Sequence, residues 1–166
     1  SDILERRDGT YWVAAEEQLC AFDPRPNRQR FQCERPKLGT ISAILQDERT
    51  LWCGTDTGLW RRPVNGANPW EFVRVIESGA TGRPAVYRLL KDARGDVWAT
   101  TVSGLYRLRS NGRVDRWTPA QGLFTDPNTG LSETPGTVWV GSSTELMRFE
   151  IDPNTGEARI ADRYGR

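Results

Sequence analysis

The stretch that decides the fold is residues 89–107, LLKDARGDVWATTVSGLYR. An apolar pair leads into a turn that contains Asp and Gly, a Val-Trp strand follows, and a Thr/Ser turn then leads into Gly104 and Leu105. Glycine in such turns tolerates the positive φ that tight hairpins require. The stretch therefore predicts short strands separated by tight turns, without a helical period.

The same arrangement recurs four times along the 166 residues. Tryptophans spaced by 40, 46 and 41 residues are each followed, seven positions later, by a leucine. Leucine fills only 13 positions, so four matches indicate a true internal repeat. The repeated anchors, which we expect to form the structural core, are Trp12, Trp52, Trp98 and Trp139 with Leu19, Leu59, Leu105 and Leu146.

Each repeat has room for four strands, the fourth being expected around Phe31, Phe72, Trp117 and Ile160. The tryptophan strands are apolar on both faces, as expected for sheets that neighbouring sheets cover on each side. Four antiparallel strands in about 40 to 45 residues are typical of a propeller blade. The prediction is an all-β fold of β-propeller blades in a single propeller region over 1–166, with repeats at about 1–40, 41–86, 87–127 and 128–166.

The repeats resemble the two-component regulator propeller repeat. The clearest copies are residues 44–62 (ILQDERTLWCGTDTGLWRR) and 89–107, whereas Gln18 and Glu145 replace the glycine before the leucine in the first and fourth copies. The resemblance implies a ligand-sensing or signal-transmitting segment of a bacterial two-component-type regulator, in the periplasm or otherwise outside the cytoplasm. Because family propellers tend to have more than four blades, we expect a closed small propeller or an arc of a larger one.

A second function stays open at this point: a non-enzymatic propeller scaffold for protein association or self-assembly. An open arc would leave two apolar blade faces uncovered, and a homo-oligomer would cover them. The 23 basic and 22 acidic residues balance to a net charge of +1, which argues against a nucleic-acid partner. No apolar stretch reaches about 18 residues, so a membrane is expected to be contacted only through segments outside this chain.

The search for catalytic motifs is largely negative. The sequence has no histidine, which excludes Ser-His-Asp and Cys-His arrangements and His-ligated zinc. It also lacks a Walker-type loop and a dinucleotide glycine fingerprint. A lyase of the kind found among related propellers would need a histidine as well. The prediction is that the segment is not an enzyme and holds neither cofactor nor metal.

The three cysteines are an odd number: Cys20, Cys33 and Cys53. If the first hairpin pairs Phe22 with Phe31, Cys20 lies directly opposite Cys33. A cross-strand disulfide and two buried thiols are then both open. Cys53 follows a tryptophan in a core strand and is expected to act as a small apolar residue.

A ligand site, if present, is expected at a loop-lined end of the propeller axis. The turns between the second and third strands carry polar groups suited to a small carbohydrate-like ligand: Glu16, Glu17, Asp56, Thr57, Thr101, Ser103, Ser142, Ser143 and Glu145. Trp70, at a loop edge, is the best candidate for an exposed aromatic. The alternative is that these turns are polar only because they meet water.

Overall fold

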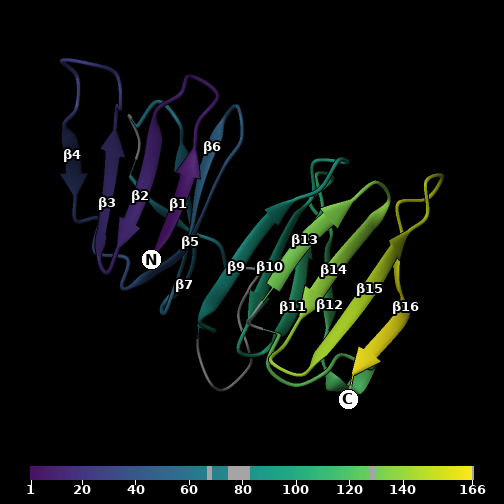
Figure 1. Cartoon of the computed structure of the whole chain (residues 1–166). Coiled ribbons are helices and arrows are strands. Elements are labelled where there is room, and N and C mark those ends of the chain that lie inside the picture. Colours follow the sequence, from purple (N-terminus) through teal and green to yellow (C-terminus); the bar gives the residue numbers. More distant parts are fainter. Residues whose placement is uncertain (67–68, 75–82, 128–129, 166) are drawn as a thin grey trace. The chain divides into compact units, whose positions relative to one another are not determined.

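The computed structural model describes residues 1–66, 69–74, 83–127 and 130–165, and it places them in four four-stranded antiparallel sheets (Figure 1). Within each sheet the strands follow one another in chain order. The predicted all-β fold of four repeats with four antiparallel strands each is confirmed. The first sheet comprises β1 (Asp2–Glu5), β2 (Tyr11–Ala15), β3 (Gln18–Phe22) and β4 (Phe31–Glu34), and the second comprises β5 (Ile41–Gln46), β6 (Thr50–Thr55), β7 (Gly58–Pro63) and β8 (Glu71–Phe72).

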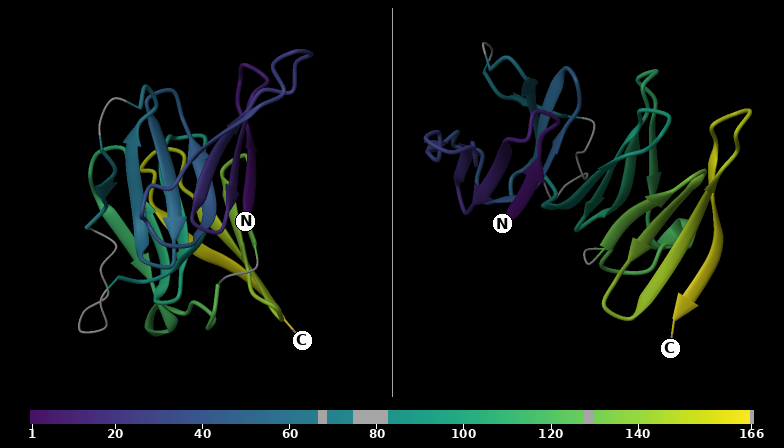
Figure 2. Two further views of the ribbon diagram at one scale, coloured as in Figure 1. Left: turned by 90° about the vertical axis from the view of Figure 1, so that its left-hand side faces the viewer. Right: turned by 45° about the horizontal axis from the view of Figure 1, so that its top comes forward.

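The remaining two sheets repeat this order. Figure 2 gives two further views of the ribbon. The third sheet comprises β9 (Val86–Lys91), β10 (Val97–Thr101), β11 (Gly104–Leu108) and β12 (Val114–Trp117). The fourth comprises β13 (Gly130–Thr134), β14 (Thr137–Gly141), β15 (Glu145–Ile151) and β16 (Ala158–Gly165). One 3₁₀ turn, Pro119–Gln121, follows β12. No helix in the described part of the chain has the length and apolar character that crossing a bilayer requires.

The chain divides into two compact units, Ser1–Val86 and Tyr87–Arg166. The first unit holds the first two sheets, and the second unit holds the other two, apart from the first residue of β9. That one propeller region runs through both units stays a prediction.

Tight turns explain why the Gly-Leu pair recurs. Gly104 has φ 133°, and a Cβ there would lie 2.4 Å from the carbonyl oxygen of Trp117. Gly58 in the second sheet is similar, with φ 123°. In the first sheet Gln18 takes this place, and Glu16 in the preceding turn has the positive φ, 55°. The turn is therefore built differently where the glycine is missing.

Each sheet has a face that carries its repeated tryptophan and leucine, called here the tryptophan face, and an opposite face. Residues paired across antiparallel strands lie on the same face, and faces alternate along a strand. In the first unit, Leu19 on the tryptophan face of the first sheet belongs to one buried cluster with Leu51 and Cys53 on the opposite face of the second sheet. The core of this unit thus lies between its two sheets.

The second unit packs in the same way. Trp98 and Leu105, from the tryptophan face of the third sheet, share a buried cluster with Val138 and Met147, from the opposite face of the fourth. The Trp98 ring stacks on that of Trp117 at 5.5 Å between ring centroids, and Phe149 meets both edge-on. Aromatic contacts of this geometry add to the stabilisation from buried area.

The predicted core position is wrong for Leu146, whose exposed fraction is 40%. Leu146 lies on the tryptophan face of the fourth sheet, and it is the opposite face that packs on the third sheet. Trp139, on the same face, is half-buried and stacks on Tyr164. Trp12 is also half-buried, whereas Trp52, Trp98, Leu19, Leu59 and Leu105 are buried. Equal sequence positions thus reach unequal burial, and Leu146 is exposed because the sheet that packs on the fourth sheet within this unit covers the opposite face.

Cys20 and Cys33 form a disulfide between the paired strands β3 and β4. Cys53 is a free, buried thiol in β6. Burial raises the pKa of the Cys53 thiol to about 12. This thiol therefore stays protonated at neutral pH and packs as a small apolar group.

Candidate functional site

The turn residues predicted to bind a ligand are largely engaged in holding their own turns. Thr101 is buried, and its hydroxyl donates to the Gly104 carbonyl at 2.9 Å and accepts from the Ser103 amide. Ser142 Oγ accepts from the amides of Thr144 and Glu145. These hydroxyls stabilise the turn conformation, as side chains in such turns commonly do.

In the first unit, one segment joins two of the predicted turns. The Glu16 carbonyl accepts from the Ile41 amide at 2.7 Å, and the Asp56 carboxylate accepts from the Thr40 amide at 2.9 Å. Thr57 Oγ1 donates to the Leu38 carbonyl. The side chains of Glu16 and Glu17 are exposed. The polar groups of Asp56 and Thr57 are therefore committed to structure.

In the second unit, an open hollow of about 500 Å³ is lined by Ser142, Ser143 and Glu145 together with Leu146 and Tyr164. The Glu145 carboxylate in this hollow forms an ion pair with Arg163. Of the two serines that were predicted to bind a ligand here, Ser143 is the exposed one. Thr101 and Ser103 do not line this hollow. The structure thus brings together three of the predicted residues here.

Trp70 is not the exposed aromatic predicted from the sequence. It is half-buried and packs against the core of the first unit. The Arg62 guanidinium lies over its ring, 4.5 Å from the centroid, and Arg62 in turn pairs with Glu34. The ring is covered by a cation, so it offers no free stacking surface.

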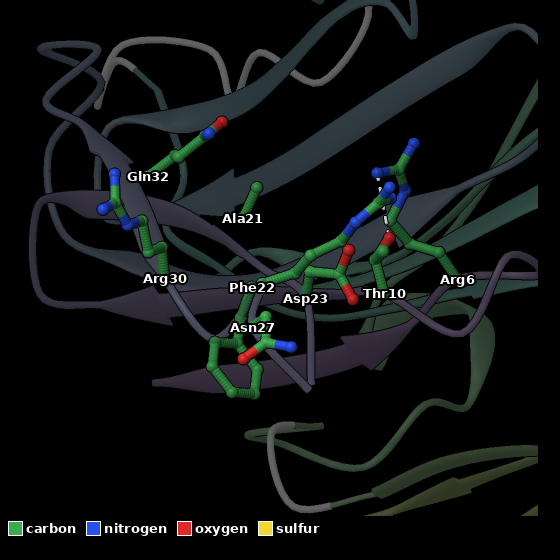
Figure 3. Close-up of a pocket in the computed structure, with 9 residues that line it drawn as sticks. Arg6, Thr10, Ala21, Phe22, Asp23, Asn27, Arg30 and Gln32 are labelled. Atoms are coloured by element: carbon green, nitrogen blue, oxygen red, sulfur yellow. Dashed lines mark hydrogen bonds between the residues drawn. The ribbon is translucent and has the colours of Figure 1, made fainter. Parts of the chain in front are cut away.

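Figure 3 shows a polar pocket on the first sheet that the sequence analysis missed. Its volume is about 460 Å³. The turn after β1, the end of β3, the loop from β3 to β4 and the strand β4 form its walls. The lining residues are Arg6, Thr10, Ala21, Phe22, Asp23, Asn27, Arg28, Arg30 and Gln32.

The charges around this pocket are unequally paired. Asp23 accepts two hydrogen bonds from the Arg25 guanidinium at 2.7 and 2.6 Å, and this contact lowers the pKa of Asp23 to about 2. Arg6 donates to Thr10. Among the residues that the structure describes, Arg28 and Arg30 have no ion pair with a carboxylate. The pocket is therefore lined by two arginines whose charge is not neutralised by contact.

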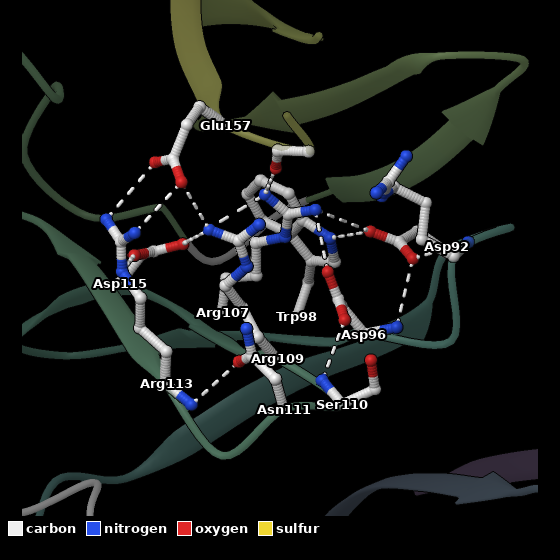
Figure 4. Close-up of polar contacts among 12 residues, drawn as sticks. Asp92, Asp96, Trp98, Arg107, Arg109, Ser110, Asn111, Arg113, Asp115 and Glu157 are labelled. Carbon is white, nitrogen blue, oxygen red and sulfur yellow. Dashed lines mark hydrogen bonds and ion pairs between the residues drawn. The ribbon is translucent and has the colours of Figure 1, made fainter. Parts of the chain in front are cut away.

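A second polar cluster, shown in Figure 4, surrounds the fully buried Arg107 of β11. Its guanidinium pairs with Asp96 at 2.7 Å and donates to the Gly156 carbonyl at 2.7 Å. Asp92 also lies within reach, at 3.6 Å, and accepts from Trp98 Nε1. Each buried carboxylate has partners within the fold, as a buried charge requires. This cluster ties the third sheet to the β15–β16 turn.

None of the described residues form a group of three or more His, Cys, Asp or Glu side chains that could hold a metal. No family model matches the sequence, and no curated protein matches it either. Functional comparison therefore rests on solved structures.

The fold is similar to that of the extracellular domain of BT4673, a one-component or hybrid two-component system of B. thetaiotaomicron. One structure of that domain matches 99% of this chain and 24% of its own length, with 17% identity and a TM-score of 0.71. The chain thus spans about a quarter of that extracellular domain. The resemblance to sensor propellers inferred from the repeats is confirmed at the level of the fold.

Two enzymes share the fold as well. Streptogramin B lyase matches 99% of this chain and 53% of its own, with 14% identity and a TM-score of 0.65. A luciferin-regenerating enzyme matches 94% of this chain and 56% of its own, with 13% identity and a TM-score of 0.64. At these identities the likeness shows the β-propeller fold alone.

These enzymes contradict the prediction that the chain is not an enzyme. That prediction rested on the absence of histidine, of a Walker-type loop and of a dinucleotide glycine fingerprint. Carboxylates and other side chains also serve as acids, bases and nucleophiles, so a missing histidine removes only one kind of chemistry.

Proposed function

We propose that this chain is a ligand-sensing segment of a bacterial two-component-type regulator. The observation that supports it most directly is the match of 99% of the chain to the extracellular domain of BT4673. The repeats along the whole sequence resemble the same class of sensor propeller. A β-propeller is a scaffold for many functions, so the sensing role rests on this likeness and on a site that binds a ligand.

The same proposal places the chain outside the cytoplasm. Its support is the disulfide between Cys20 and Cys33. Disulfides of this kind form and persist in oxidising compartments and are rare in the reducing cytosol. The compartment is also that of the extracellular domains to which the fold is similar.

A thermal-shift screen tests the sensing proposal. The protein is heated with a panel of neutral and acidic mono- and oligosaccharides, and the unfolding midpoint is recorded for each. A ligand that binds only the folded state at 100 times its Kd should raise the midpoint by about 5 to 10 °C. Calorimetric titration of each positive sugar checks that binding is saturable. A panel without any shift or heat of binding would contradict sensing of carbohydrates by this chain.

A second candidate function is association between copies of this chain, and the uncovered sheet faces favour it. On the tryptophan face of the fourth sheet, Leu146 is 40% and Tyr164 51% exposed. On the opposite face of the first sheet, Ile3 is 68% and Phe31 60% exposed. In both units the tryptophan face of one sheet packs on the opposite face of the next. The fourth sheet of one copy would therefore pack head-to-tail on the first sheet of a second copy.

Sedimentation velocity over a hundredfold range of concentration tests this association. Wild-type protein is expected to show a mass that rises with concentration, and Leu146→Glu to remain a monomer because a charge would be buried in the contact. Val102→Glu is the matched control, since Val102 is an exposed apolar residue on a turn, outside the proposed contact. A monomer at all concentrations, or equal loss of association in both variants, would overturn this second candidate.

A further inference from the structure

The pocket on the first sheet lies at a position where the repeats differ. In three sheets the residue paired with the repeated tryptophan is an arginine: Arg61, Arg107 and Arg148. In the first sheet it is Ala21. An arginine side chain is several atoms longer than the alanine methyl group. The first sheet therefore lacks the long side chain that the other three sheets carry at this position.

The residue on the next strand differs in the same way. The three arginines are paired in the register with Glu71, Asp115 and Asp162. They form ion pairs with these carboxylates. Ala21 is paired with Gln32, whose amide carries no charge. Both members of a repeated ion pair are thus replaced in one sheet, and the replacements line the pocket.

An arginine still lies over the tryptophan of the first sheet, but it comes from the turn after β1 and not from β3. The Arg6 guanidinium lies over the Trp12 ring at 5.4 Å, much as Arg61 lies over Trp52 and Arg107 over Trp98. Two further arginines of the β3–β4 loop, Arg28 and Arg30, line the pocket. In Figure 3, Arg30 lies beside Gln32, whereas the Phe22 ring points to the other side of the sheet. The pocket has thus gained cations and lacks the carboxylate of the repeated ion pair, since Gln32 takes its place.

We propose that this pocket binds a small molecule through an oxyanion group, such as a carboxylate, sulfate or phosphate. Guanidinium groups present several N–H donors in a planar fork that matches such groups, and the contacts are charge-assisted. The Gln32 amide adds a neutral donor at the same wall. The Asp23 carboxylate in the same lining is held by Arg25 through two hydrogen bonds, and among the described residues it forms no ion pair with Arg28 or Arg30.

This inference deepens the proposed sensing function, on which its biological role rests, by naming the ligand chemistry and the site. It also has consequences that stand apart from sensing. Binding at exposed arginines should weaken as ionic strength rises, because salt screens such charges. A neutral ligand of the same shape should bind much less tightly, since it cannot replace the oxyanion.

The test is calorimetric titration of the whole chain with four probes at low salt: glucuronate, glucose, sulfate and phosphate. Glucuronate and glucose differ by the carboxylate, and the two inorganic ions separate a response to any oxyanion from one to an organic acid. We expect saturable binding of glucuronate or of an inorganic oxyanion, and at least about tenfold weaker binding of glucose. Equal affinity for glucuronate and glucose, or no binding of any oxyanion, would overturn the proposal.

Two variants locate the site. Ala21→Arg with Gln32→Glu rebuilds the ion pair of the other sheets, and it should fill the pocket and abolish oxyanion binding while the chain stays folded. Arg28→Gln with Arg30→Gln removes the cations without filling the space, and it should weaken binding at least about tenfold. Arg49→Gln is the matched control, because Arg49 is exposed and does not line the pocket.

The outcomes are distinct from those of the sensing test. If the variant with the rebuilt ion pair does not fold, the variant at Arg28 and Arg30 still tests the site. Both of these side chains are exposed, so their replacement should leave the fold intact. Oxyanion binding that survives in this variant would place the site elsewhere and overturn the assignment. A neutral sugar that stabilises wild-type and variant equally, while no oxyanion binds, would support sensing and contradict the oxyanion pocket. Loss of oxyanion binding in the pocket variants but not in Arg49→Gln supports the pocket, whatever the sensing test gives.

Discussion

The interface between the two sheets differs between the two units, although it is formed by equivalent positions of the repeat. In the first unit the interface is an apolar cluster around Leu19 and Cys53, with a hydrogen bond from Trp12 Nε1 to Gln46 at 2.6 Å. In the second unit it is an aromatic cluster beside the buried cation of Arg107. The position of Arg107 is Ala21 in the first sheet, where a pocket opens. One repeat position thus holds a buried ion pair in the third sheet and borders a candidate binding site in the first sheet.

The largest expected effect concerns Arg107. Arg107→Ala leaves Asp92 and Asp96 buried without their cation, which should lower the free energy of unfolding by about 3 to 5 kcal/mol. Denaturant unfolding followed by tryptophan fluorescence measures it. Arg61→Ala is the comparison: its pair with Glu71 is exposed, so a loss below about 1 kcal/mol is expected. Similar losses of unfolding free energy in both variants would contradict the expectation that the buried ion pair matters more for stability than the exposed one.

Reducing the disulfide should lower the stability of the first unit and leave that of the second unit unchanged. The bond from Cys20 to Cys33 closes a short loop in the first unit only. A loop of this length contributes about 3 kcal/mol through the entropy of the unfolded chain. Hydrogen exchange with and without reductant should show faster exchange in β3 and β4 and unchanged protection in β10 and β14. Uniform loss of protection across both units would contradict a local effect.

The tryptophans should differ in their contribution to stability. Trp98→Ala removes a fully buried ring from the aromatic cluster and should cost about 3 to 5 kcal/mol. Trp139→Ala removes a half-buried ring and should cost about 2 kcal/mol less. Both are measured by denaturant unfolding at low protein concentration. Equal costs would mean that the exposed face of the fourth sheet is covered in solution, as the association candidate requires.

The smallest expected effect is the response to acid. Hydrogen bonds from Arg109 and Arg25 lower the pKa of Glu157 and of Asp23, the latter to about 2. A group whose pKa is lower in the folded state stabilises the fold above its unfolded pKa and loses this contribution as pH falls through the folded value. Asp23 should therefore lose its contribution between about pH 4 and 2. Asp23→Asn should show a flatter stability curve there, and unchanged curvature would contradict the Arg25 contact.

Much of the fold was predictable from local patterns. The spacing of the tryptophans and the Gly-Leu pairs indicated four repeats of four strands, because tight turns and apolar strands leave strong local signals. The register that places Cys20 opposite Cys33 followed from pairing Phe22 with Phe31. The sequence did not decide between a disulfide and two free thiols, and the structure shows the disulfide. The pocket left a weaker signal, the alanine and glutamine at positions where other repeats carry an arginine and an acid. That signal becomes readable only once the strand register pairs Ala21 with Gln32.

Several residues predicted to bind a ligand instead make contacts within the fold, and the sequence could not show this for a physical reason. A polar turn residue looks alike in sequence whether it faces water, a ligand or its own backbone, and the structure shows Thr101 and Asp56 bonded within the fold. Trp70 likewise looked free beside a loop but lies under Arg62, a residue that the chain brings to it from another strand.

The sequence by itself determined the strands, the turns and the fourfold repeat, because these depend on residues close together in the chain. Only the tertiary structure decided which repeated positions are buried, since Leu19 meets another sheet and Leu146 does not. It also decided that the space beside Ala21 is open and lined by arginines, because its walls come from one turn, two strands and a loop. Burial and charge pairing depend on which surfaces meet, and that information lies in the packing of the sheets.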